Sequence, residues 1–176
     1  GRDMQMSDDN FVGARNFANK IWNASRFVMM NLKDFKPVEI PLSDRTPADR
    51  WIAQRFTDTL AQVDGFLTGF DPSQAARALY GFFWNDFCDW YVEAAKTRVQ
   101  DPAAQPHVLA VQDLVIREFL LLFAPFAPFI TEELWHLLGY GAAGEFLQST
   151  RIGTSDGITA QLASLGIRID SEATAR

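Results

Sequence analysis

Residues Arg15–Phe27 read RNFANKIWNASRF, and this stretch predicts a long amphipathic helix. Phe17, Ile21, Ala24 and Val28 recur every three or four residues, which is the spacing of one face of an α-helix. Apolar side chains on one face need a core to pack against. We therefore expect this helix to cover the core of a helical protein.

A second row of side chains runs along the same helix beside the apolar one. Asn16, Lys20, Asn23 and Phe27 follow helical spacing, yet they combine amides, a cation and an aromatic ring. Unpaired nucleic-acid bases stack on aromatic rings and are read at their edges by such polar groups. The alternative is a solvated helix face with Phe27 turned into the core. The residues alone leave both interpretations open.

Helix start and stop signals divide the rest of the chain. Thr46–Pro47 and Asp71–Pro72 are typical helix starts, and Gly139 is a typical stop. Together with the apolar spacing, these signals predict helices at 9–32, 47–69, 72–97, 104–123 and 131–138. Short connections between long helices favour antiparallel neighbours. We predict an all-α fold, an antiparallel helical bundle of four long helices plus a short fifth, with an irregular C-terminal tail.

The bundle is expected to occupy residues 1–140, and residues 141–176 to form an irregular extension or the start of a following element. The chain opens on Gly1 and has its first methionine at Met4, so we expect a piece of a longer protein. The later helices should add to the core the apolar row Leu79, Phe83, Phe87, Tyr91, Leu114, Leu121 and Phe123.

Composition excludes several classes of protein. The single cysteine, Cys88, forms no internal disulfide, which fits a reducing compartment. No apolar run approaches the roughly 20 residues that a membrane helix needs. The histidines His107 and His136 lie far apart, and no Cys/His set has metal-ligand spacing. We predict a protein without membrane association and without a bound metal.

Charge is distributed unevenly along the chain. The net charge is −6, which by itself argues against a nucleic-acid partner. However, residues 1–37 carry six Lys and Arg against four Asp and Glu, whereas 38–96 and 97–176 each carry five against nine. No acidic residue occurs between Asn10 and Lys33. The basic segment of this acidic chain is therefore the first predicted helix.

Catalytic motifs are weak in this sequence. GTSDG, at 153–157, matches the nucleophile elbow G-x-S-x-G around Ser155, but that motif needs a later histidine and an α/β sheet. Asp86 and Asp89 lie three residues apart in a predicted helix and share a face. They could act as a general acid/base pair, as ion-pair anchors for arginines, or as acceptors for a ligand. With no metal partner or nucleophile nearby, anchoring or ligand contact is favoured over catalysis.

Several motifs together resemble one family over residues 1 to about 140. The anticodon-binding domain of valyl-tRNA synthetases is similar in order and rough spacing to GRDMQMS, RNFANKIWNASRF, AARALYGFFWNDFCDWYVEAAK and FAPFAPFITEELWHLLG. Isoleucyl, leucyl and methionyl synthetases share the helical bundle and a version of the last motif. The first helix and WNDFCDWYVE favour the valyl family. The alternatives are the isoleucyl or leucyl domain, or a helical protein-interaction bundle without an RNA role.

The resemblance implies a class I aminoacyl-tRNA synthetase as the parent protein. Such an enzyme uses ATP and Mg²⁺ to join valine to tRNA(Val) in the cytoplasm. The HIGH and KMSKS signatures of its catalytic site are absent from this chain, so the segment itself has no catalytic site and no cofactor. Its expected partners are the tRNA(Val) anticodon loop and the catalytic domain of the same protein. After Gly139 the sequence departs from the family pattern, because it has neither a Trp-Pro pair nor heptads.

The resemblance also implies which residues contact the anticodon. Phe27 and Val92 match positions that stack on bases, and Lys20 and Glu93 match positions that form hydrogen bonds to base edges or backbone. Glu93 can accept a hydrogen bond from a cytosine amino group. From their place on the same helix face, Asn16 and Asn23 are added to this set.

A second group of charged residues has two alternative roles. Arg15, Arg26 and Lys33 could contact phosphates. Alternatively, Arg15 and Arg26 could pair with Asp86 and Asp89 and tie the two helices together.

Overall fold

The computed structural model describes residues 8–32, 46–141 and 144–147, and every regular element in these ranges is helical. The elements are α1 (Asp8–Leu32), α2 (Pro47–Thr68), α3 (Pro72–Gly81), the π-helical segment η2 (Phe82–Val92), α4 (Glu93–Val99), α5 (Gln105–Phe123) and α6 (Pro128–Leu137). The all-α prediction is confirmed, and four of the five predicted helix starts lie within one residue of the observed ones.

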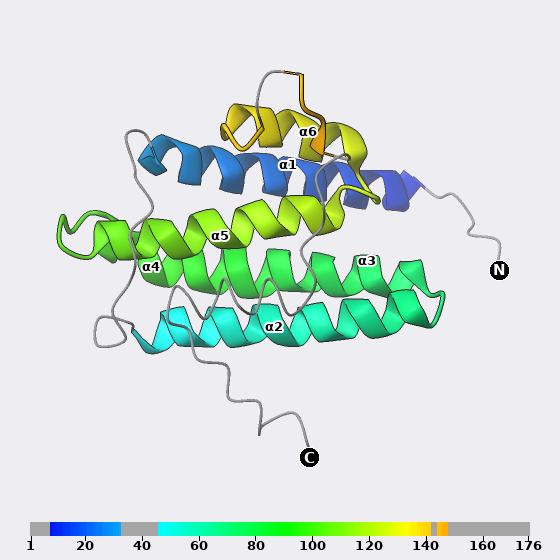
Figure 1. Cartoon of the computed structure of the whole chain (residues 1–176), viewed down its shortest axis with the longest axis horizontal. Coiled ribbons are helices and arrows are strands. Elements are labelled where there is room, and N and C mark those ends of the chain that lie inside the picture. The colour runs from blue at the N-terminus through cyan, green and yellow to red at the C-terminus, as the bar shows by residue number, and fades with distance from the viewer. Residues whose placement is uncertain (1–7, 33–45, 142–143, 148–176) are drawn as a thin grey trace, which may run out of the picture.

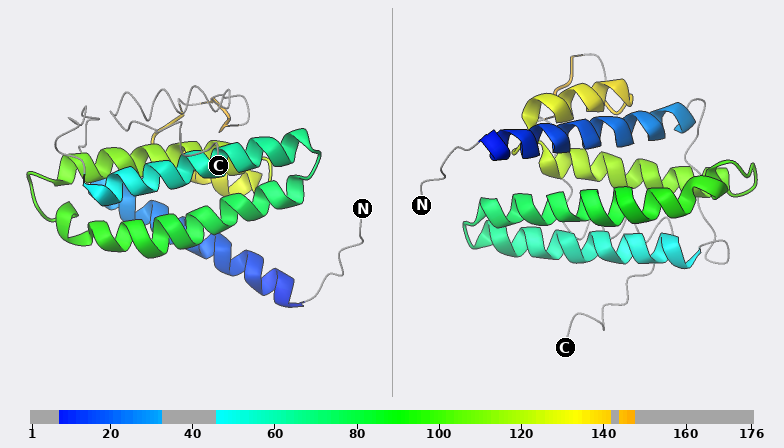
Figure 2. Two further views of the ribbon diagram at one scale, coloured as in Figure 1. Left: turned by 90° about the horizontal axis from the view of Figure 1, so that it is seen from below. Right: turned by 180° about the vertical axis from the view of Figure 1, so that it is seen from behind.

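Three rods form the body of the molecule, namely α2, the rod that runs from α3 to α4, and α5 (Figure 1). The second of them is continuous from α3 through η2 to α4, where the sequence predicts one helix over 72–97. A short turn after α2 returns this rod alongside α2, and another short connection leads to α5. Helix α1 lies obliquely across these rods, as the left panel of Figure 2 shows, and contacts α5, α6 and η2.

The middle of the second rod winds as a π-helix over eleven residues. Its aromatic side chains fill the space between neighbouring rods: Phe82 stacks on Phe56 of α2, with ring centroids 4.9 Å apart, and Phe83 stacks on Phe119 of α5 at 4.1 Å. The wider turn increases the angle between side chains three residues apart. Residues that an ordinary helix would place on one face therefore point toward different neighbours.

The predicted apolar rows form the core. Phe17, Ile21 and Val28 of α1 are buried, and Ala24 is partly buried. The residues assigned to the core on the later helices, from Leu79 to Phe123, are also buried. Each large apolar side chain that is fully buried contributes about 1.5–3 kcal/mol relative to exposure. This burial fixes α1 in its oblique position and decides which of its faces remains accessible.

The predicted capping signals act at α2 and after α6. Thr46 and Asp49 form a reciprocal capping box, with Pro47 in the first turn. Gly139 has φ of 76°, the left-handed conformation that ends a helix most easily at glycine. The predicted start of the last helix at residue 131 is wrong, because α6 begins at Pro128, directly after the non-helical residue Ala127. A proline in the first turn of a helix lacks only an amide that would be unpaired there.

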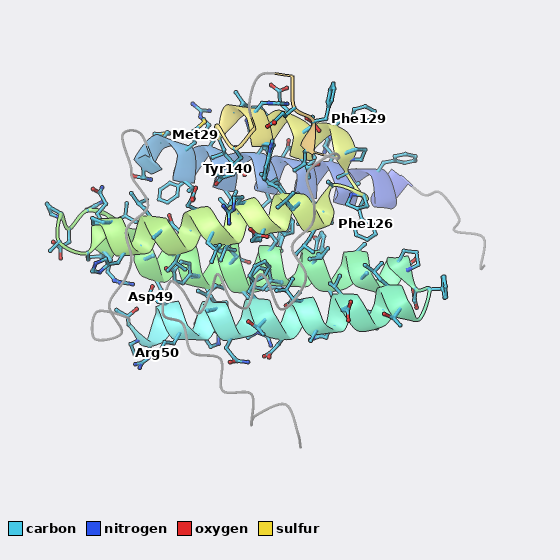
Figure 3. All side chains as sticks on the ribbon, viewed as in Figure 1. Met29, Asp49, Arg50, Phe126, Phe129 and Tyr140 are labelled. Atoms are coloured by element: carbon cyan, nitrogen blue, oxygen red, sulfur yellow. The ribbon has the colours of Figure 1, made fainter. Side chains whose placement is uncertain are left out.

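Two polar contacts attach the end of the described chain to the bundle. Tyr140 follows α6 and points toward α5, where its hydroxyl donates a 2.7 Å hydrogen bond to Asp113 (Figure 3). The Leu147 amide donates to the Glu132 carboxylate at 3.0 and 3.1 Å. The predicted irregular segment 141–176 lies largely outside the described residues, so the division at residue 140 stays a prediction.

Candidate nucleic-acid interface

A groove with a volume of about 520 Å³ lies between α1 and the rod formed by η2 and α4. Its walls include every residue that the sequence assigns to anticodon contact, namely Asn16, Lys20, Asn23, Phe27, Val92 and Glu93. The two groups of residues are more than 60 positions apart in the sequence, and the oblique packing of α1 brings them together. The structure thus gathers the predicted residues in one place, while their binding role stays a prediction.

Other residues lining the groove were not predicted as contacts. Asn19 and Ala24 come from α1, and Cys88, Asp89 and Lys96 come from η2 and α4. Helical spacing contains a signal for some of them, because Asn19 follows Asn16 by three positions and Lys96 follows Glu93 by three. Their presence makes the groove richer in amides and charges than the predicted set alone.

The two apolar residues assigned to base stacking differ in exposure. Phe27 is half-buried: it packs against the core and also lines the groove. Phe27 is therefore partly turned into the core, and its role in base stacking stays a prediction. Val92 is only 8% exposed and belongs to the core. It forms part of the groove wall and presents only a small apolar surface to a ligand.

The cations of the groove are both paired with carboxylates. Lys20 Nζ lies 2.6 Å from Asp89 Oδ1, and Lys96 Nζ lies 2.6 Å from Glu93 Oε1. Lys20 Nζ also lies 3.8 Å from the ring centroid of Trp84, a cation–π contact. The groove therefore carries balanced charge together with three asparagine side chains, a composition suited to neutral hydrogen-bonding groups.

The predicted pairing of Arg15 and Arg26 with two aspartates is wrong. Asp86 binds Arg55 of α2, with Nε and Nη2 at 3.0 and 2.9 Å, and Asp89 binds Lys20. The wider π-helical turn directs Asp86 toward α2 and Asp89 toward α1, so the two carboxylates do not act as one acid/base pair. Within the described part of the chain, Arg15 and Arg26 are exposed and make no ion pair. Lys33 lies outside the described residues.

A buried polar network fixes the rod that forms the second wall of the groove. Asp49, which is 1% exposed, accepts hydrogen bonds from Arg98 at 2.9 and 3.0 Å and from the Tyr91 hydroxyl at 2.7 Å. Figure 3 shows Asp49 at the start of α2. Burial by itself would raise the pKa of Asp49, but the hydrogen bonds from Arg98, Tyr91 and Thr46 outweigh it and hold that pKa below its ordinary value. Burial beside this carboxylate raises the pKa of Tyr91 well above 10.0.

Nucleophilic and metal-binding chemistry find no support in the groove. Burial raises the pKa of the Cys88 thiol to about 12, so this thiol stays protonated at neutral pH and is a poor nucleophile. Across the described ranges, no group of three or more His, Cys, Asp and Glu side chains could hold a metal ion. Ser155 of the GTSDG motif lies outside these ranges. No helix among the described elements is long and apolar enough to span a membrane.

Comparison with known families decides the assignment. Residues 49–163 match the model of the anticodon-binding domain of tRNA ligase. The chain belongs to this family. The anticodon-binding domain accounts for most of the described bundle, and α1, which supplies one wall of the groove, precedes the matched segment.

Similar relatives of this anticodon-binding domain are valine–tRNA ligases. That of Thermotoga maritima is 46% identical over 138 residues, covering 78% of this chain and 16% of the relative. That of Petrotoga mobilis is 40% identical over 154 residues, covering 86% and 17%. The resemblance to the valyl family is therefore confirmed, and the chain spans about a sixth of the length of these relatives.

A solved structure shares the fold of the anticodon-binding domain. It is the ternary complex of Agrobacterium radiobacter K84 agnB2 LeuRS, tRNA and LeuAMS, with a TM-score of 0.63 and 22% identity. The similarity covers 95% of this chain and 18% of that one. At this level of identity the likeness concerns the fold alone.

Proposed function

We propose that this anticodon-binding domain belongs to a valine–tRNA ligase and that its groove receives unpaired bases of the tRNA(Val) anticodon loop. One observation carries the proposal: the six residues assigned to base contact from the sequence line a single groove. The similarity to valine–tRNA ligases supports the choice of tRNA. The likeness in fold to a synthetase crystallised with tRNA agrees with it.

Each groove residue has a role that follows from its chemistry. The exposed part of the Phe27 ring offers a surface for stacking, and Val92 closes the wall behind the base. The Glu93 carboxylate accepts a hydrogen bond from a base amino group, and Lys20 donates to a base acceptor. The amides of Asn16 and Asn23 can do both, so they suit the edges of several bases.

Phosphate contacts fall to the cations outside the groove. Arg15 and Arg26 are exposed on α1, and neither lines the groove. They lie on the same helix as the groove residues and make no ion pair with another described residue, so they suit the backbone of the loop. Lys33 is assigned to the same role from the sequence.

The remaining activity belongs to the parent protein in this proposal. The catalytic domain of the same protein would use ATP and Mg²⁺ to activate valine and transfer it to tRNA(Val). The present chain would hold the anticodon end of the tRNA while this reaction proceeds. The proposal keeps the parent in the cytoplasm and the bundle in residues 1–140. Residues 141–176 would then form an irregular extension or the start of a following element.

Titration with two RNA stem-loops tests the proposal. One carries the valine anticodon, and the other is changed at its second and third anticodon bases. At low salt we expect the chain to bind the first more tightly, by about 5- to 150-fold for each of the two changed bases that it reads, since a well-read base is worth about 1–3 kcal/mol. Tighter binding of the changed stem-loop would contradict the choice of tRNA(Val). Equal or absent binding would disprove direct readout.

A further inference from the structure

The Lys20 ammonium is held from two sides by η2. Asp89 Oδ1 lies 2.6 Å from Nζ, and the Trp84 ring centroid lies 3.8 Å from it. The Lys20 side chain is only 21% exposed although it lines an open groove. A lysine on a helix surface normally samples many rotamers, because its stem has four flexible carbons. Here an ion pair and a cation–π contact act together to restrict it.

The ring below the ammonium is itself fixed by the core. Trp84 stacks on Tyr80, with centroids 5.6 Å apart and an interplanar angle of 12°. It also lies parallel to Phe17, at 6.2 Å, and Phe17 is buried. The ring that holds the Lys20 ammonium is therefore packed against side chains of both α1 and the second rod. Asp89, whose side chain is 52% exposed, is the more accessible of the two residues that hold the ammonium.

This arrangement changes which acceptors Lys20 can bind. An ammonium has three donors, and Asp89 takes one of them. A phosphate that approached Lys20 would also meet the carboxylate of Asp89, and the two anions would repel each other. A neutral carbonyl oxygen or ring nitrogen of a base meets no such repulsion. The Lys20–Asp89 pair thus favours binding to the edges of bases over binding to the RNA phosphate backbone, which carries no sequence information.

We propose that Asp89 is a specificity-determining positioning residue, which holds Lys20 on Trp84 as a donor to base edges and keeps RNA phosphates out of the groove. The inference rests on the proposed function and deepens it. Lys20 without this partner would be an ordinary phosphate-binding lysine, which adds affinity but reads no sequence.

The variant Asp89→Asn tests the role, with Asp86→Asn as the matched control. Both changes remove one negative charge from η2, but Asp86 pairs with Arg55 and does not line the groove. In the free protein, the NMR shifts of the Lys20 ε-methylene report its place over the indole ring. We expect Asp89→Asn to move these shifts toward those of a free lysine, and Asp86→Asn to leave them unchanged.

Binding of the two stem-loops supplies the functional measurement. In Asp89→Asn we expect the preference for the valine anticodon to fall at least about fivefold. The slope of the logarithm of the binding constant against the logarithm of salt concentration should steepen by about 0.7, because the released Lys20 contacts a phosphate. Asp86→Asn should match the wild type in both respects.

The outcomes separate this inference from the proposed function. If Asp89→Asn keeps the wild-type preference, slope and Lys20 shifts, Asp89 is not a positioning residue. If Asp86→Asn reproduces the changes, the effect is one of overall charge and the inference is again overturned. A wild-type chain without anticodon preference overturns the proposed function and this inference together.

Discussion

Phe27 is the residue whose two roles can be separated by substitution. It packs against the core and lines the groove, so Phe27→Ala removes both a stacking surface and part of a packed ring. Loss of stacking should weaken binding of the valine stem-loop by about 1–3 kcal/mol, or roughly 5- to 150-fold. Because the ring is only half-buried, thermal unfolding should show a loss below the 3–5 kcal/mol of a fully buried phenylalanine, at about 1–2 kcal/mol.

Phe27→Leu is the matched control for this prediction. Leucine keeps most of the apolar contact with the core but has no aromatic face, so the melting temperature should stay near that of the wild type. RNA binding should fall as in Phe27→Ala. Wild-type affinity in Phe27→Leu would show that the ring serves the core and not a base.

Asp49 should stabilise the bundle in a pH-dependent way. Asp49→Asn leaves the half-buried Arg98 guanidinium without its carboxylate, and removal of one partner of a buried ion pair costs about 3 kcal/mol. The folded-state pKa of Asp49 is lowered from 3.8. Its contribution is therefore complete above about pH 4 to 5 and is lost as the pH falls through the folded-state value.

Urea unfolding of wild type and Asp49→Asn between pH 7 and pH 3 measures this contribution. The difference in unfolding free energy should be constant near neutral pH and shrink below about pH 4. Burial raises the pKa values of Asp113 and Glu118, but these carboxyls occur in both chains and cancel in the difference. A difference that grows on acidification would contradict the assignment.

Two glycines of the bundle differ in backbone conformation, one after the end of a helix and one inside a helical rod. Gly139 has φ of 76°, so Gly139→Ala should destabilise the chain by about 1–2 kcal/mol although no atom lies within 4 Å of the added Cβ. Gly81 sits within the second rod at φ −61° and ψ −46°, also with free space around a Cβ. Gly81→Ala should stabilise it by about 0.4–1 kcal/mol. Chemical unfolding measures the change in stability of each variant. Changes of the same sign in Gly139→Ala and Gly81→Ala would contradict the prediction.

Element boundaries were predictable where a local signal sets them. Pro47 and Pro72 begin helices, and Gly139 follows the end of the last one, because proline and glycine act through their own backbone geometry. The π-helical winding of Phe82–Val92 has no such local signal. In the structure, aromatic rings of this segment stack on rings of α2 and α5, contacts that the local sequence does not reveal.

The sequence was enough to predict six residues of the candidate site, but not the other residues that line it or the ion pairs within it. The spacing along α1 was enough to place Lys20 and Phe27 on one face, and the family resemblance added Val92 and Glu93. Which cation meets which aspartate depends on the crossing of α1 over η2 and on the wider π-helical turn. For this reason the Lys20–Asp89 pair was not predicted.

At the scale of the whole molecule, the proposed function assigns phosphate contact and base readout to different surfaces. The chain carries a net charge of −6, and each lysine of the groove is neutralised by a carboxylate. The exposed cations Arg15 and Arg26 lie on α1 outside the groove. General attraction to RNA should therefore be weak and come from the arginines, whereas base preference should come from the groove.

The double variant Arg15→Ala/Arg26→Ala tests this separation. Loss of two phosphate contacts should weaken both stem-loops alike and reduce the salt slope of binding by about 1.4 in magnitude, at about 0.7 for each phosphate of a single strand. The preference for the valine anticodon should not change, because neither side chain lines the groove. Arg77→Ala, which removes an exposed cation from α3, should leave slope and preference at wild-type values. If the double variant lost preference while it kept its salt slope, these arginines would read bases, and the groove would not be the sole site of readout.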